Sequence, residues 1–445
     1  MITYIIRNAN IVNEGKIFAG DVLIREGKIA SVGKNLPAVS GAVEIDADGK
    51  CLLPGCIDDQ VHFREPGLTH KADIQSESRA AVAGGITSFM EQPNTSPPAT
   101  TIELLEWKYR RASEVSPANY SFFMGTTNSN LDEILQLDPR KVCGVKIFLG
   151  SSTGDMLVDR EEQLDKIFAN VKMLIAVHAE DDVMIKQNLA KYKEQYGDNV
   201  PVEMHPLIRS REACYASSSK AIARAKKFGT RLHIFHVSTA DELSLFDNSI
   251  PLREKKITAE VCVHHLWFSD ADYKTKGNYI KWNPAVKTAN DREEIWKAVL
   301  DNRIDVIATD HAPHTIEEKE KSYLDAPSGG PLVQHALVAM LEKAREGKIT
   351  IERVVEKMAH APADLFRIDK RGYIREGYYA DLVLVDLNAP WTVTKDDVLS
   401  KCGWSPFEGT TFHAQVMKTF VNGNIAYDRG RIVDFAPGMR MEFNT

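Results

Sequence analysis

Eight short runs of strand-forming residues in the middle of the chain constrain its fold more than any other feature. Helical stretches such as KADIQSESRAAVAGG and DREEIWKAVLDN lie between most of them. Strands that alternate with helices over about 250 residues are typical of a (β/α)8 barrel. The long interval from 178 to 231 predicts an extra helix. The runs are residues 56–63, 86–93, 119–126, 142–149, 172–180, 231–238, 256–266 and 304–313.

An open, doubly wound sheet is the alternative architecture for this pattern. Such a sheet commonly binds a dinucleotide through a GxGxxG turn after its first strand. No such turn follows residues 56–63. The sequence therefore favours an α/β fold of the TIM-like barrel type.

The two ends of the chain differ from the middle because they are rich in strand-forming patterns and poor in helical ones. Stretches such as GDVLIREGKIASVG near the start and QVMKTFVNGNIAYDRGRIV near the end alternate apolar and polar residues and break at Gly and Asn. We expect residues 1–53 and 366–445 to pair into one small β-sandwich domain. Residues 54–365 would then form the barrel.

Composition excludes several classes of partner. The net charge is −7 and there is no basic run, so neither nucleic acid nor an anionic membrane is expected to bind. Six cysteines without paired spacing favour reduced thiols in a cytoplasm. There is no signal-like start and no apolar run near the roughly 18 residues of a membrane span. We therefore expect a cytoplasmic protein.

Polar residues follow most of the predicted strands at the end where a barrel enzyme carries its active site. Lys146, His178, His236 and Asp310 each end an apolar run, which would bring their side chains to the mouth of the barrel. The full set of candidates is His62, Arg64, Asn94, Lys146, His178, His236, Asn283 and Asp310, with His311 and His314 just beyond.

Three histidines and an aspartate at one barrel mouth predict a zinc site. Neutral imidazole and carboxylate are good ligands for Zn²⁺, and a catalytic site leaves one position open for water. The metal lowers the pKa of that water to roughly 7. Asp310 is then placed to move a proton from the attacking water to a leaving nitrogen.

Lys146 is unusual among such ligands because a protonated amine repels a cation. Two arrangements resolve this conflict. The lysine pairs with a carboxylate, or its amine reacts with CO2 to form an anionic carbamate that bridges two metals about 3.5–4 Å apart.

The stretch GCIDDQVHFREPG, residues 55–67, sets one expectation about side-chain direction. In a regular strand Asp58, Gln60 and His62 share a face. By the same alternation His233 would face away from His236, toward the helices. We interpret His233 and the histidines outside the candidate set as structural or surface residues.

Several motifs together resemble the cyclic amidohydrolase superfamily, and more closely the dihydroorotases. VHFREPG, QPNT and TDHAPH are the motifs most specific to dihydroorotases. The resemblance covers nearly the whole chain and rests on PGCIDDQVHFREPG, EQPNT, GVKIFLGSSTG, VHAED, HVST, NPAVK, ATDHAPH and GYYADLVLVD.

The resemblance implies a role for each candidate residue. His62 and Asp310 would hold one zinc, His178 and His236 a second, and carboxylated Lys146 would bridge the two. Asp310 would also be the general acid and base. Arg64, Asn94 and His314 would hold the substrate carboxylate, and Asn283 would touch the ring. The reaction would be reversible closure of N-carbamoyl-L-aspartate to L-dihydroorotate in pyrimidine synthesis.

The chain departs from the family pattern at Gln60. The family reads Asp-x-His-x-His where this chain has Asp58, Gln60 and His62. A glutamine oxygen is a weak zinc ligand beside imidazole. We therefore expect one or two zinc ions per chain, with the site near Gln60 and His62 weakly occupied.

Two other functions remain open at this point. A hydantoinase, dihydropyrimidinase or allantoinase uses the same chemistry but needs no carboxylate clamp, and Arg64 would then pair with Glu65 or Asp58. Loss of a ligand at Gln60 would also suit a non-catalytic scaffold for aspartate transcarbamoylase. A homo-oligomer, such as a dimer, is the expected state. The Gly- and Ser-rich loop 151–157 is either a lid or an ordinary loop.

Overall fold

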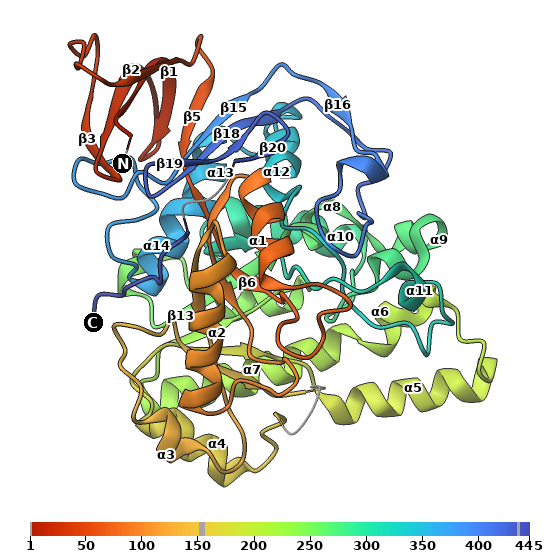
Figure 1. Cartoon of the computed structure of the whole chain (residues 1–445). Helices are drawn as coiled ribbons and strands as arrows, with labels where there is room; N and C mark the ends of the chain where they lie inside the picture. Colours follow the sequence, from red (N-terminus) through yellow and green to blue (C-terminus); the bar gives the residue numbers. More distant parts are fainter. Residues whose placement is uncertain (1, 151–155, 434–436) are drawn as a thin grey trace.

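A ring of parallel strands forms the centre of the computed structural model, which describes residues 2–150, 156–433 and 437–445 (Figure 1). One part of the ring is β6 (Cys56–Val61), β7 (Ile86–Glu91) and β8 (Asn119–Phe122). The other part is β9 (Met124–Gly125), β10 (Val145–Phe148), β11 (Ile175–His178), β12 (Leu232–Ile234), β13 (Ile257–Cys262) and β14 (Val306–Ala308).

Backbone hydrogen bonds close the ring on both sides. Phe123 lies between β8 and β9 and donates to Glu91 O at 3.0 Å, so these two strands are pieces of one. On the other side His62 donates to His311 O at 2.7 Å, just beyond β14. The eight predicted strand positions are thus joined, and the predicted barrel is confirmed.

Helices cover the outside of the ring and occupy the intervals that the sequence predicted. The long interval after β11 holds two long helices, α5 (Asp182–Tyr196) and α7 (Arg211–Phe228). Ser210 caps the start of α7, and Gly229 ends it with a left-handed φ of 70°. The other helices are α1 (Ile74–Ala83), α2 (Ile102–Val115), α3 (Leu131–Ile134), α4 (Glu161–Asn170), α6 (His205–Ile208), α8 (Val263–Trp267), α9 (Tyr273–Lys276), α10 (Ala289–Leu300), α11 (Ile316–Lys319), α12 (Ala336–Arg345), α13 (Ile351–Val355) and α14 (Ala361–Phe366).

A second sheet joins the two ends of the chain, as the sequence predicted. Its order is β20-β19-β18-β15-β5-β1-β2-β3, and β4 pairs with β1. The N-terminal strands are β1 (Tyr4–Asn13), β2 (Lys16–Arg25), β3 (Lys28–Gly33), β4 (Val43–Asp46) and β5 (Cys51–Pro54). The C-terminal strands are β15 (Leu382–Asp386), β18 (Gln415–Val421), β19 (Asn424–Asp428) and β20 (Arg431–Ile432). A separate ribbon pairs β16 (Trp391–Thr392) with β17 (Thr411–Phe412).

The tail after this sheet returns to the barrel. Gly438 donates to Ser116 O at 2.7 Å, and the buried Met441 and Phe443 pack with Phe366. The division at residues 53/54 and 365/366 stays a prediction. None of the described helices is both long and apolar enough to cross a membrane.

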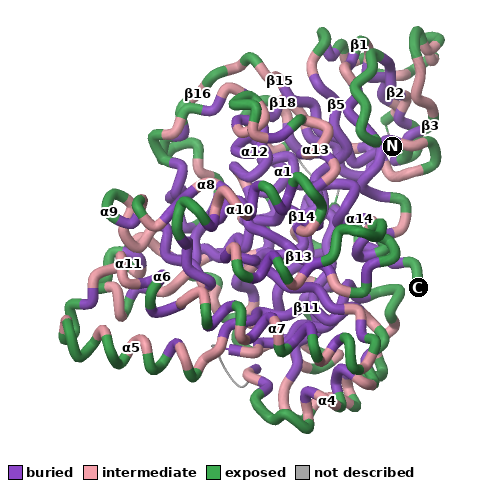
Figure 2. The backbone as a smooth tube through the Cα atoms, turned by 180° about the vertical axis from the view of Figure 1, so that it is seen from behind, coloured by how far each residue is buried: buried purple, intermediate pink, exposed green. Residues whose placement is uncertain are grey.

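Apolar side chains fill part of the barrel interior. Figure 2 shows the strands of the ring as the buried centre of the molecule. Phe123, Phe235 and Phe366 pack together in this interior with residues from the tail.

A buried ion pair joins the barrel to its helical cover and gives a first prediction. Lys108 of α2 lies 2.7 Å from Glu91 of β7, and both side chains are fully buried. Lys108→Met leaves a buried carboxylate without its cation and should lower the free energy of unfolding by about 3 kcal/mol. Urea denaturation measures this change. Adding Glu91→Gln should recover part of the loss, and a single variant as stable as the original chain would contradict the prediction.

Candidate active site

One cavity, of about 280 Å³, opens among the carboxyl ends of the barrel strands. The structure brings the predicted side chains to its wall with the exception of His311, which is buried and pairs with Glu77 at 2.7 Å. Gln60, Phe148 and Trp282 also line it, together with the loop residues Pro327, Ser328 and Gly329. The predicted residues on the wall are His62, Arg64, Asn94, Lys146, His178, His236, Asn283, Asp310 and His314.

His178 and His236 direct ring nitrogens at each other. His178 Nδ1 lies 2.9 Å from His236 Nε2, and both side chains are buried. On its other side His178 Nε2 is 3.0 Å from the carboxylate of Glu180. Burial opposes ionisation of Glu180, but the adjacent Arg209 lowers its pKa to about 2. A carboxylate behind an imidazole orients the ring, as it does for metal-bound histidines.

His62 and Asp310 form a second facing pair. His62 Nε2 lies 3.1 Å from Asp310 Oδ1, and Asn94 Oδ1 accepts a hydrogen bond from His62 Nδ1 at 2.8 Å. Because Nδ1 carries the proton in that bond, Nε2 keeps its lone pair, and this lone pair faces Asp310. Burial lowers the pKa of both His62 and His236, which keeps these imidazoles neutral. Neutral imidazole beside carboxylate is a suitable donor set for a divalent cation.

Lys146 is almost fully buried between two aromatic rings. Its Nζ lies 4.0 Å from the ring centre of Phe235 and 4.9 Å from that of Phe148. Burial lowers the pKa of Lys146 to about 7. In the described part of the chain no carboxylate lies within 4.0 Å of this amine, so it has no salt bridge there. A neutral amine is the form that reacts with CO2.

Arg64 presents to the cavity a cation that forms no salt bridge with any of the described residues. Its Nε donates to Pro313 O at 3.0 Å, and its Nη2 lies 3.0 Å from His314 Nε2. The carboxylates considered as partners are engaged elsewhere: Glu65 pairs with Arg111 at 2.7 Å, and Asp58 accepts from Thr309 at 2.6 Å. Burial lowers the pKa of Arg64 to about 10. A guanidinium in this state favours an anionic ligand.

Three residues of the site have left-handed backbone conformations, as do several loop residues elsewhere in the described chain. Arg64, His236 and Asp310 have φ values of 68°, 42° and 50°. Residues with side chains rarely adopt this left-handed region, and strain of this kind gathers at functional sites. These turns aim three side chains into one cavity.

The strand that carries Gln60 is irregular, which corrects one expectation. The register of β6 against β7 shifts between Asp58 and Val61. Asp59 therefore contacts His233 inside the barrel, while the next residue, Gln60, lines the cavity. Asp58 instead bonds to Thr309. Gln60 and His62 both line the cavity, as expected of residues on one face, but a bulge breaks the alternation and turns Asp59 inward as well.

His233 is a second correction. It faces the barrel interior and not the helices, because it lies 3.3 Å from Asp59 and 3.6 Å from Glu260. Strand β12 ends at Ile234, and His236 has a positive φ of 42°. The regular alternation of side chains therefore stops between His233 and His236. His233 and His236 therefore both point inward. Alternation is a reliable guide only within a continuous strand.

Sequence reasoning missed several residues of the site. Glu180 falls within the VHAED motif, and a carboxylate two residues after a candidate ligand was a usable signal. Trp282 and Ser328 lie in loops, and nothing in their local pattern pointed to the cavity. In the loop 151–157, residues 151–155 lie outside the described residues.

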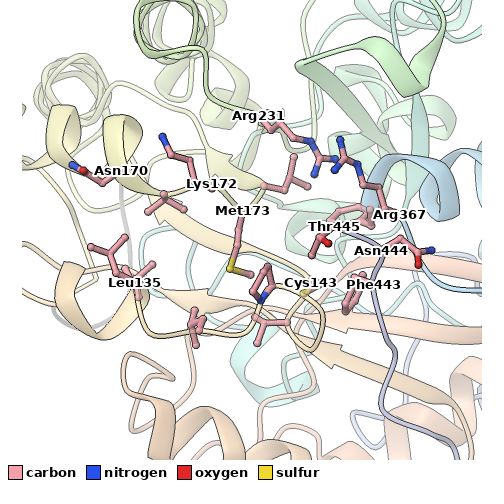
Figure 3. Close-up of a pocket in the computed structure, with 17 residues that line it drawn as sticks. Leu135, Cys143, Asn170, Lys172, Met173, Arg231, Arg367, Phe443, Asn444 and Thr445 are labelled. Atoms are coloured by element: carbon pink, nitrogen blue, oxygen red, sulfur yellow. The ribbon is translucent and has the colours of Figure 1, made fainter.

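A separate cavity, of about 370 Å³, lies where the tail meets the barrel (Figure 3). Its walls are mainly apolar, with Arg231 and Arg367 drawn together at one edge. Its cysteine, Cys143, is fully buried, which raises the pKa of that thiol to about 12. It has no imidazole or carboxylate side chain on its wall. The chemistry therefore belongs to the cavity at the strand ends.

Comparisons with known proteins agree with this geometry. The sequence profile described as "Amidohydrolase family" matches residues 51–426. A dihydroorotase of Halobacterium salinarum is 33% identical over 93% of this chain and 97% of its own. A dihydroorotase of Ligilactobacillus salivarius is also 33% identical, over 96% of this chain and 99% of its own.

Solved structures resemble the whole chain. An L-hydantoinase (dihydropyrimidinase) from Arthrobacter aurescens aligns with a TM-score of 0.92 at 26% identity, over 98% of both chains. A dihydropyrimidinase from Brevibacillus agri aligns with a TM-score of 0.87 at 24% identity, over 97% of this chain and 96% of its own. The second likeness bears on the fold alone.

Proposed function

The chain belongs to the amidohydrolase family, and we propose that it is a dihydroorotase that closes N-carbamoyl-L-aspartate to L-dihydroorotate reversibly, in pyrimidine synthesis. It is a hydrolase of cyclic amides, and its full-length relatives at 33% identity carry the name dihydroorotase. The observation that carries the substrate assignment is Arg64, a buried guanidinium at the cavity wall without a carboxylate partner among the described residues. The substrate carboxylate would supply that partner.

Binding at this wall follows from the donors that surround Arg64. The guanidinium offers a planar pair of N–H groups that matches a carboxylate. The NH2 group of Asn94 faces the cavity because its oxygen is held by His62. Asn283 Oδ1 is buried without a hydrogen-bond partner in the described structure, so it can accept from a ring N–H. Burial keeps His314 neutral by lowering its pKa, so it does not repel the arginine.

The metal would be held by side chains that already face one another. We propose that His178 and His236 hold one zinc ion, that His62 and Asp310 hold the other, and that carboxylated Lys146 lies between them. A divalent cation at this place supplies Lewis acidity and makes water acidic enough to ionise near neutral pH. The unpartnered His236 Nδ1 and the opposed nitrogens of His178 and His236 fit such a group.

Asp310 is the residue we propose to move the proton. In ring opening its carboxylate takes a proton from the water that attacks the ring carbonyl. It then delivers this proton to the amide nitrogen as the C–N bond breaks. The same steps in reverse close the ring. The positive φ of Asp310 holds the carboxylate at the cavity wall, within 3.1 Å of His62.

A direct assay tests the proposed function. Purified protein with Zn²⁺ should hydrolyse L-dihydroorotate and cyclise N-carbamoyl-L-aspartate. It should turn over 5-substituted hydantoin and allantoin at least about 10⁴-fold less efficiently, because these rings leave the buried Arg64 unpaired. Faster turnover of either neutral ring would favour the hydantoinase or allantoinase alternative. Absence of turnover together with less than one zinc per chain would favour the scaffold alternative.

Gln60 gives a prediction about metal retention. Its amide oxygen accepts from Cys262 Sγ at 3.5 Å and lies beside the His62 half of the site. Gln60→His replaces a weak ligand by an imidazole. The affinity for the zinc next to His62 should therefore rise by at least about 10-fold. Zinc titration against a competing chelator measures this. An unchanged affinity would show that position 60 does not contact the metal.

Location and assembly follow as smaller proposals. Every cysteine is free and buried, which suits the reducing cytoplasm we propose for this chain. We propose that the chain forms a homodimer, which gel filtration can test. Association with aspartate transcarbamoylase is a second prediction, which co-purification can test.

A further inference from the structure

A second group of ligand-type side chains lies inside the barrel, beneath the active site. Asp59 of β6, His233 of β12 and Glu260 of β13 are all fully buried. Their ligand atoms lie within 4.8 Å of one another. From this cluster we infer a divalent-cation site, separate from the catalytic one, that ties three strands of the barrel together. The inference does not depend on the proposed function.

The spacing of the atoms fits a cation better than hydrogen bonds. His233 Nε2 is 3.3 Å from Asp59 Oδ2 and 3.6 Å from Glu260 Oε2. Yet these three atoms, and Asp59 Oδ1, have no hydrogen-bond partner in the described structure. Ligands at 2.0–2.2 Å from a tetrahedral zinc lie roughly 3.3–3.6 Å apart. Both distances from His233 are therefore those expected between ligands that share one cation.

Hydrogen bonds behind the cluster fix the direction of the imidazole. Thr258 Oγ1 donates to Leu232 O at 3.4 Å, so its oxygen is free to accept from His233 Nδ1 at 2.8 Å. With a cation bound, the proton on Nδ1 leaves the lone pair of Nε2 facing that cation between the two carboxylates. Without a cation, burial opposes the charge on His233, but Asp59 and Glu260 raise its pKa to about 9, so a proton on Nε2 takes the place of the metal. A bond of this type behind the ring is what orients metal-binding histidines.

The remaining oxygens and the charges fit the same assignment. Glu260 Oε1 accepts from His236 N at 3.2 Å and from Cys262 Sγ at 3.3 Å, which leaves Oε2 for the cluster. A divalent cation neutralises the two buried carboxylates while the imidazole stays uncharged. Without one, a single imidazolium has to balance two acidic groups that are buried away from water, which is costly.

Phe235 separates this cluster from the catalytic cavity. Its ring packs edge to face against His233 at 5.2 Å, and Lys146 Nζ lies 4.0 Å from the centre of the same ring. None of Asp59, His233 and Glu260 lines the cavity. A metal here would act on the fold and not on the substrate. One imidazole and two carboxylates favour Zn²⁺ or Mn²⁺ over softer ions.

Counting metal in matched variants tests the site. Chelator-treated protein is reloaded with Zn²⁺, desalted, and its metal measured by mass spectrometry. Asp59→Asn should lose one equivalent of zinc and melt at a lower temperature in the presence of Zn²⁺. The matched control is Asp58→Asn, since Asp58 is the adjacent buried carboxylate but bonds to Thr309. It should keep the full count.

Combining variants distinguishes the two metal sites. His178→Asn should remove catalytic metal, and His178→Asn with Asp59→Asn should lose one equivalent more. If Asp59→Asn does not fold, Glu260→Gln replaces it and should give the same loss. Two results would overturn the inference. One is a zinc count in Asp59→Asn equal to that of the original chain, and the other is a zinc count in the double variant equal to that of His178→Asn. In that case the cluster shares a proton. Because the readout is bound zinc, the result stands whether or not the dihydroorotase assay succeeds.

Discussion

Replacing Asp310 with asparagine should lower the rate of dihydroorotate turnover by at least about 10³-fold, in a protein that keeps its fold. The amide has nearly the same shape as the carboxylate but cannot accept the proton of the attacking water. It also faces His62 Nε2, at 3.1 Å in the original chain, so zinc should bind more weakly. Initial rates at saturating Zn²⁺ and substrate separate these two effects.

Controls for Asp310→Asn need the same chemical change outside the cavity. Asp325 is exposed, bonds to Ser322 at 2.7 Å and does not line the cavity. Asp325→Asn should retain full activity. Far-UV circular dichroism and a thermal melt check the fold of both variants. If Asp310→Asn kept most of the original rate at saturating Zn²⁺, Asp310 would not be the group that moves the proton.

Replacing Arg64 with methionine should raise the KM for dihydroorotate by at least about 100-fold while kcat changes much less. Methionine keeps an apolar stem but removes the charge and the paired N–H donors. Charge-assisted hydrogen bonds contribute about 1.5–3 kcal/mol each, and a bidentate carboxylate contact uses two of them. The loss should fall on binding because the carboxylate is remote from the bond that breaks. Steady-state kinetics in both directions measures it.

The specificity of the Arg64 effect is checked with a second arginine and a second substrate. Arg111 pairs with Glu65 outside the cavity, so Arg111→Met should leave the KM unchanged. Any residual turnover of a neutral hydantoin should also survive Arg64→Met. Equal loss on charged and neutral rings, or failure of Arg64→Met to fold, would make Arg64 a structural residue.

Much of the fold followed from local pattern. Eight strand runs alternating with helices predicted the barrel, and strand-rich ends predicted the shared terminal sheet. Both predictions work because hydrophobic periodicity reflects which face of an element is buried. The candidate set followed from one further rule, that barrel enzymes carry their chemistry at the carboxyl ends of strands. Lys146, His178 and Asp310 could thus be named from apolar runs that end in a polar residue.

What the sequence by itself determined was the order of the elements, the end of the barrel that carries chemistry and the residue types available there. Only the tertiary structure decided where individual side chains point. A bulge in β6 turns Asp59 inward beside Gln60, and the left-handed turn at His236 places His233 on the same side. Such breaks in alternation depend on how neighbouring strands pair. Contacts between residues far apart in the chain, such as Asp59 with His233, therefore leave no local pattern.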